Sequence, residues 1–172
     1  MDLRYPVGEF KPADSYGEDD RRRFIREVEE TPARLRAAVG GLSGEQLDTP
    51  YRPGGWTVRQ VVHHLPDSHM NGFIRMKLAL TEDEPMVKTY MEDRWAELAD
   101  AKLEPNVSLA LLDAVHERWV TIWRSLGDEE FSRKFKHPEW GTLKLEQHLA
   151  LYAWHGRHHV AHITSLRERE GW

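Results

Sequence analysis

The chain has 172 residues, 40% of them hydrophobic and 31% charged, which is the composition of a globular domain and not of a disordered or fibrous chain. Its 24 Lys and Arg are interspersed with 29 Asp and Glu, and the formal net charge of −5 argues against binding to nucleic acid. Cysteine is absent, which excludes disulfides, thiolate metal sites and a cysteine nucleophile within the chain.

The N-terminal segment lacks the apolar core of a signal peptide, and no apolar run approaches the roughly 20 residues that a membrane helix needs. We therefore expect a cytoplasmic protein without membrane contacts. Residues 1–172 are predicted to form a single domain. Within it, residues 1–17 contain two Pro and two Gly and are predicted to form an extended N-terminal arm.

The first predicted helix covers residues 18–39 and ends at Gly40. Its apolar residues recur at spacings of four and seven on one face: Phe24, Val28, Leu35 and Val39. Pro32 lies inside this segment and leaves two alternatives. The helix is either kinked there, or it restarts with Thr31 as its N-cap and Pro32 in its first turn.

A loop rich in Pro and Gly is predicted for residues 42–55. A second helix is predicted to begin at Thr57, because Gln60 three residues later has the spacing of a capping box. This helix continues to about residue 80. Pro66 lies inside it and is expected to remove one internal hydrogen bond and bend the helix.

Residues 82–107 are predicted to form a long crossover with a short helix around residues 91–99. The third helix is predicted to begin with Ser108 as N-cap and to run to Leu126, and the fourth covers residues 142–170. No segment alternates in the manner of a strand. The predicted fold is therefore all-α, an antiparallel four-helix bundle with long connections.

Eight of the ten histidines fall within residues 63–69 and 148–162. On the fourth helix, His155 and His159 share the apolar face, whereas His158 lies on the polar side and His162 at the boundary. Imidazoles one turn apart can coordinate the same ion. Burying such a pair without partners is costly, so the spacing favours a metal site in the bundle interior.

A third ligand has to come from another helix, and the second helix offers His63, His64 and His69. His64 is favoured because it shares a side of that helix with Val61, Leu65 and Ser68, whereas His63 falls on another side. Spacing alone leaves a second interpretation open, in which hydrogen bonds hold the inward histidines in the core and the others are solvated at the surface.

Three runs of residues are distinctive: YRPGGWTVRQVVHHLPDSHMN, KLALTEDEP and YAWHGRHHVAHI. They closely resemble the DinB-like superfamily and, within it, the YfiT-like candidate metal-dependent hydrolases, and the resemblance extends over almost the whole chain. One departure is Pro66, where relatives usually have Ala, two residues from His64.

The resemblance implies a four-helix bundle, a homodimer and a three-histidine metal site, carried here by His64, His155 and His159. That set agrees with the helix-face assignment. The implied cofactor is one divalent ion per chain, with zinc preferred over nickel, iron or cobalt. By analogy with functional relatives, the resemblance also implies transfer of bacillithiol or a similar low-molecular-weight thiol.

Several other residues near these segments are candidates for a role at the site, and most of them have a second interpretation. Gly156 occupies the place of the general base in a zincin HExxH motif, so a zincin mechanism is not expected. Arg59 is either a substrate anchor or a solvated residue, and His162 either donates to the site or caps its edge. Four residues are candidate partners of the ligands, with surface charge the favoured role: Asp67, Asp113, His116 and Glu117. Four tryptophans are assigned to the core or a dimer surface, with substrate stacking as the alternative: Trp56, Trp119, Trp123 and Trp154.

Three neutral histidines leave a divalent ion with its charge and at least one open position, which is typical of a catalytic site. The predicted function is a metal-dependent enzyme acting on a small molecule. It either hydrolyses this substrate or transfers a low-molecular-weight thiol of the bacillithiol type to an electrophile. The alternative is a non-catalytic bundle in which the ion only ties helices together.

Overall fold

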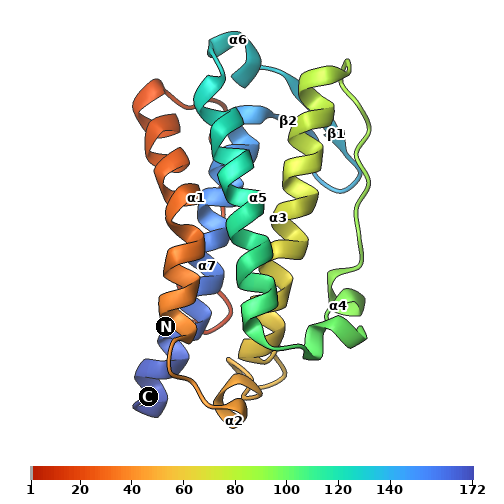
Figure 1. The fold of residues 1–172 in the computed structure, drawn as a ribbon. Helices are drawn as coiled ribbons and strands as arrows, with labels where there is room; N and C mark the ends of the chain where they lie inside the picture. Colours follow the sequence, from red (N-terminus) through yellow and green to blue (C-terminus); the bar gives the residue numbers. More distant parts are fainter. Residues whose placement is uncertain (1) are drawn as a thin grey trace.

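The computed structural model describes residues 2–172 and contains four long helices that form a bundle (Figure 1). These helices are α1 (Glu18–Val39), α3 (Val58–Thr81), α5 (Pro105–Ser125) and α7 (Leu145–Glu170). Each packs against two neighbours, so that the order around the bundle is α1, α5, α3 and α7. The predicted all-α four-helix bundle is confirmed, and among the described helices none combines the length and apolar character needed to span a membrane.

The connectivity is not a simple up-and-down arrangement. Helices α3 and α5 run in the same direction, as do α1 and α7, whereas α1 and α5 are antiparallel and so are α3 and α7 (Figure 1). The parallel register of α3 and α5 is visible in their contacts, since His63 meets Ser108 and Met76 meets Trp119 further along. A parallel pair requires a long return, which explains the crossover between these helices.

The connections carry short elements of their own: α2 (Gly44–Leu47), α4 (Glu92–Trp95), η1 (Ala99–Lys102), α6 (Asp128–Phe131), β1 (Lys134–His137) and β2 (Gly141–Lys144). The strands form an antiparallel hairpin in which Phe135 pairs with Leu143. The prediction of no strands was wrong, and α7 begins at Leu145 because residues 142–144 belong to β2. Four-residue strands are too short for their alternation to stand out from a neighbouring helix.

Helix starts follow local chemistry. At the start of α3, Thr57 Oγ1 accepts from the Gln60 amide at 3.1 Å and Gln60 Oε1 accepts from the Thr57 amide at 3.0 Å, which confirms the predicted capping box. Helix α5 begins three residues before the predicted N-cap Ser108, with Pro105 in its first turn, where a missing amide hydrogen is tolerated.

Both internal prolines lie within continuous helices. Helix α1 runs unbroken through Pro32, so the alternative in which Thr31 caps a new helix is wrong. The Thr31 hydroxyl instead donates to the Glu27 carbonyl one turn back, at 2.8 Å. Helix α3 likewise continues through Pro66.

The N-terminal arm lies along α7. The Trp154 indole donates to the Gly8 carbonyl at 3.0 Å, the Lys144 ammonium donates to the Asp14 carbonyl at 2.9 Å, and the Gln147 amide donates to the Ala13 carbonyl at 3.0 Å. The arm therefore covers a side of α7 that would face solvent in an isolated bundle.

Helices α1 and α7 approach closely at Gly156. A Cβ atom added there would lie 2.4 Å from Thr31 Oγ1 and 2.9 Å from its Cγ2. Because these distances are shorter than van der Waals contact, glycine sets the separation of the two helices next to His155.

We expect Gly156→Ala to lower the free energy of unfolding by about 1–3 kcal/mol, because overpacking outweighs the higher helix propensity of alanine. Urea unfolding measures the change. The double variant with Thr31→Ala should recover much of the loss, and Gly44→Ala, whose new methyl group meets nothing within 4 Å, is the control. Unchanged stability of Gly156→Ala would contradict the close approach.

Candidate metal centre

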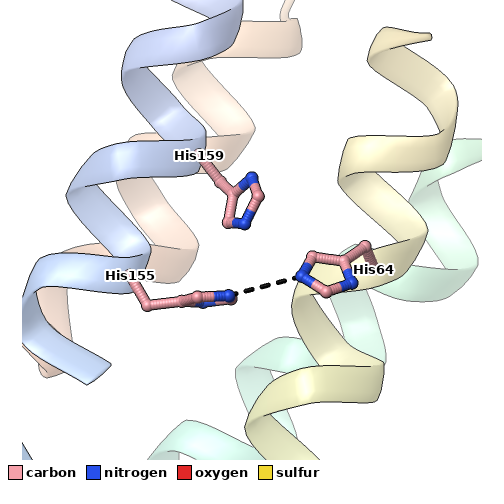
Figure 2. A group of neighbouring side chains, drawn as sticks. All are labelled: His64, His155 and His159. Carbon is pink, nitrogen blue, oxygen red and sulfur yellow. Dashed lines mark hydrogen bonds between the residues drawn. The ribbon is translucent and has the colours of Figure 1, made fainter. Parts of the chain in front are cut away.

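The structure brings His64, His155 and His159 together between α3 and α7 (Figure 2). Each offers a ring nitrogen, and the three nitrogens lie within 4.8 Å of one another. The Nε2 atoms of His64 and His155 are 3.3 Å apart. Two ligands about 2.0–2.1 Å from a tetrahedral zinc ion are separated by about 3.3 Å, so this pair already has the spacing of a metal site.

His63, the neighbour of His64, is bound elsewhere. Its Nδ1 lies 2.6 Å from Ser108 Oγ and its Nε2 lies 2.9 Å from the Leu103 carbonyl oxygen. With both ring nitrogens engaged, His63 ties α3 to the crossover and to α5. Of the two adjacent histidines, only His64 faces α7.

Burial keeps the clustered imidazoles neutral. It lowers the pKa of His64 to about 3, with a smaller contribution from His162, and it lowers the pKa values of His155 and His159 well below the ordinary value. A neutral imidazole has a free lone pair, which a metal ion requires. The Nδ1 of His159 is buried without a hydrogen-bond partner among the described residues, as expected for a site completed by an ion or water.

Two further histidines lie behind His155. Its Nδ1 is 3.0 Å from His69 Nε2, and His69 Nδ1 is 2.7 Å from His116 Nε2. The last ring ends on α1, where His116 Nδ1 is 2.6 Å from the Val28 carbonyl oxygen. The surface role favoured for His116 is therefore wrong, because only 2% of this residue is exposed and α1 covers it.

The other candidate partners lie apart from the cluster. Asp113 pairs with Arg36 on the surface, Glu117 is exposed, and Asp67 is half-buried with its pKa raised to about 6, mainly by burial. Arg59 is neither solvated nor free for a substrate: its Nε donates to Asp48 at 2.7 Å and its Nη1 to the Leu103 carbonyl at 3.1 Å.

The assignment of His158 to a polar face was wrong, since both His158 and His162 are buried and contact Tyr5 and Arg4 of the N-terminal arm. His162 Nε2 donates to the Arg4 carbonyl at 3.0 Å, and its ring stacks on Tyr51 at a centroid distance of 3.9 Å. His158, His159 and His162 form a second group of closely spaced ring nitrogens. All three rings belong to α7, and the N-terminal arm covers two of them through Tyr5 against His158 and Arg4 against His162, which a helical wheel cannot reveal.

A cavity of about 650 Å³ opens beside the three histidines. Its wall includes Tyr5, Arg52, Trp56, Arg75, Tyr90 and Trp140. The Trp56 ring lies 4.6 Å from that of His64, whereas Trp119 and Trp123 are fully buried in the core. Of the four tryptophans considered, Trp56 and Trp154 line the cavity and are placed to contact a bound molecule.

A four-helix bundle with an inward-facing histidine cluster beside a cavity defines the structural class. Residues 27–163 match the profile of the DinB superfamily, and the chain belongs to that superfamily. It is 54% identical over 171 residues to a protein of Bacillus mycoides strain KBAB4 and 55% identical over 171 residues to one of Bacillus cereus strain B4264, covering 99% of each. Both relatives are named as candidate metal-dependent hydrolases.

Solved structures agree with the fold. YfiT from Bacillus subtilis, described as a candidate metal-dependent hydrolase with an unusual four-helix bundle topology, superposes with a TM-score of 0.97 at 51% identity. The match covers 100% of this chain and 99% of YfiT. TT2238, a four-helix bundle protein, has a TM-score of 0.61 at 21% identity and covers 84% of this chain, which supports the fold alone.

We expect the chelator-treated protein to lose stability in mild acid. Its buried imidazoles have lowered pKa values, about 3 for His148 and about 4 for His116, so below about pH 6.5 the unfolded chain binds more protons than the folded chain. The stabilisation is complete above that pH and is lost as the pH falls toward the folded values.

The free energy of unfolding should fall by more than about 1.4 kcal/mol per pH unit between about pH 6 and pH 5, because several imidazoles are involved. Urea titrations at a series of pH values measure the slope. A slope corresponding to less than one proton would contradict the burial of neutral histidines.

Proposed function

We propose that this protein is a metal-dependent enzyme of the hydrolase type, in which His64, His155 and His159 hold one divalent ion. The observation that most supports this proposal is the 3.3 Å separation between the Nε2 atoms of His64 and His155, which lie on facing helices. Both imidazoles are neutral and lie beside the cavity. Zinc suits this donor set, and nickel, iron and cobalt are alternatives. The names of close relatives as candidate metal-dependent hydrolases support the same reaction class.

When bound, such an ion supplies the Lewis acidity that activates water or a thiol as a nucleophile. The chain supplies the surroundings. His69 holds His155 from behind, Trp56 and Tyr90 offer aromatic faces for a small-molecule substrate, and Arg75 is placed to bind an anionic group. Zincin-type base catalysis is not part of the proposal, because Gly156 carries no side chain and packs on Thr31.

A second candidate function is transfer of a low-molecular-weight thiol, of the bacillithiol type, to an electrophilic small molecule. The observation that favours it is the absence of cysteine from the chain, which means that a thiol nucleophile has to come from solution.

We also propose that the protein is a homodimer, on the strength of the family resemblance. A purely structural ion is less well supported, because structural zinc sites usually have four protein ligands and this cluster has three among residues 2–172.

The ligand set predicts about one divalent ion per chain by elemental analysis. His155→Ala and His159→Ala should abolish binding, and so should His64→Ala. His63→Ala is the matched control: it should keep the ion while losing stability, because its imidazole bonds to Ser108 and Leu103. Retention of the ion by His64→Ala together with its loss from His63→Ala would show that the neighbour is the ligand.

The reaction is tested by assaying ester and amide hydrolysis beside conjugation of an electrophile with several thiols, each with and without metal. We expect activity that requires the metal and disappears in His155→Ala. In the cobalt-substituted protein, a thiol co-substrate should produce a sulfur-to-metal charge-transfer band, whereas a hydrolase should be inhibited by thiols without turning them over. If neither activity exceeds that of the His155→Ala control, the structural-metal function replaces the enzyme.

A further inference from the structure

A line of hydrogen bonds starts at His155 Nδ1, on the side of the ring away from His64, and crosses the bundle. It passes from His155 on α7 to His69 on α3, then to His116 on α5, and ends at the Val28 carbonyl on α1. The three N···N or N···O separations are 3.0, 2.7 and 2.6 Å. All four long helices therefore contribute one group each to this line.

The end of the line fixes the direction of every hydrogen bond in it. A carbonyl oxygen only accepts, so His116 Nδ1 carries the hydrogen, and in a neutral ring His116 Nε2 must then accept. His69 Nδ1 donates to that acceptor, which leaves His69 Nε2 to accept from His155 Nδ1. His155 Nε2 is consequently the atom with the free lone pair.

The same assignment accounts for the contact on the other side of the ring. His155 Nε2 lies 3.3 Å from His64 Nε2, and as an acceptor it receives the hydrogen of His64. In the absence of an ion His64 is therefore the donor of the pair. His155 has the tautomer that metal binding requires, and His64 is the ring that has to give up its Nε2 hydrogen.

Pro32 explains why the line ends where it does. In an α-helix the carbonyl of residue 28 accepts from the amide of residue 32, but proline has no amide hydrogen. The Val28 carbonyl is thereby left without its helical partner inside the bundle, where it accepts from His116 instead. A residue that weakens α1 locally thus supplies the acceptor that orients the three rings.

We propose that His69 and His116 are positioning residues that hold His155 in its Nδ1–H tautomer, with the Nε2 lone pair directed at the metal site. The inference rests on the proposed function for the identity of the ligand. Metal-binding histidines commonly donate their second nitrogen to a carboxylate or a carbonyl. Here two neutral rings, His69 and His116, lie between His155 and the Val28 carbonyl. This line therefore contains no carboxylate that would offset the charge of the ion.

The tautomer is tested directly by nitrogen NMR of the metal-free protein labelled with ¹⁵N-histidine, with the His155 signals assigned by their loss in His155→Ala. We expect the wild type to show a protonated Nδ1 and an unprotonated Nε2 at neutral pH. A protonated Nε2 on His155 would overturn the proposal, whether or not the protein binds metal.

Metal affinity, measured by competition with a chromophoric chelator, tests the consequence. His69→Leu should weaken zinc binding about 10–100-fold, as loss of such a partner typically does. His69→Gln should stay within a few-fold of wild type, because its side-chain oxygen accepts from His155 and its amide donates to His116. His116→Leu should weaken binding in the same direction by a smaller factor.

His148→Leu is the matched control, since, like His69→Leu, it removes a fully buried imidazole. His148 lies on α7, and its one hydrogen bond among residues 2–172 is to the Gly72 carbonyl oxygen at 2.9 Å. Its affinity should remain that of the wild type. Equal affinities of His69→Leu and wild type, or equal losses in His69→Leu, His69→Gln and His148→Leu, would overturn the positioning role. A wild type that binds no metal would instead defeat the proposed function, and the NMR result would still decide the tautomer.

Discussion

Burying an imidazole costs least when the ring is neutral and its nitrogens have partners, and this constraint shapes the interior of the bundle. His63, His69, His116 and His148 each bond to a backbone carbonyl, a hydroxyl or another ring. Meeting these requirements depends on the helix register. The parallel alignment of α3 and α5 places His69 beside His116, and the long crossover is the connection that makes this alignment possible.

The sequence predicts much of this arrangement because helices have a strong period. The spacing of His155 and His159 places both on the inner face of α7, and the face shared with Leu65 separates His64 from His63. Capping at Thr57 is equally local and was predicted correctly. The structure brings these three histidines to one place.

Helical periodicity could not predict features that depend on contacts between distant segments of the chain. The burial of His116 depends on which side of α5 meets α1, and that of His158 depends on Tyr5 of an arm some 150 residues earlier in the chain. The β1–β2 hairpin is stabilised by its pairing and by the bridge from Met86 to Lys136, neither of which leaves a periodic trace. Pro32 in the sequence suggests a kinked or broken helix. In the structure α1 is continuous, and Pro32 leaves the Val28 carbonyl free to accept a hydrogen bond from His116.

Much of the cavity wall comes from connections, while the clustered histidines come from long helices. Tyr5 lies on the arm, Trp56 precedes α3, Tyr90 lies on the crossover and Trp140 is at the hairpin turn. The helices are fixed by their packing, whereas connecting segments accept substitution and insertion more readily. If the proposed function holds, chemistry and selectivity are encoded in separable parts of one small chain. A library that varies only these connections could redirect the choice of substrate while the bundle and its histidines stay intact.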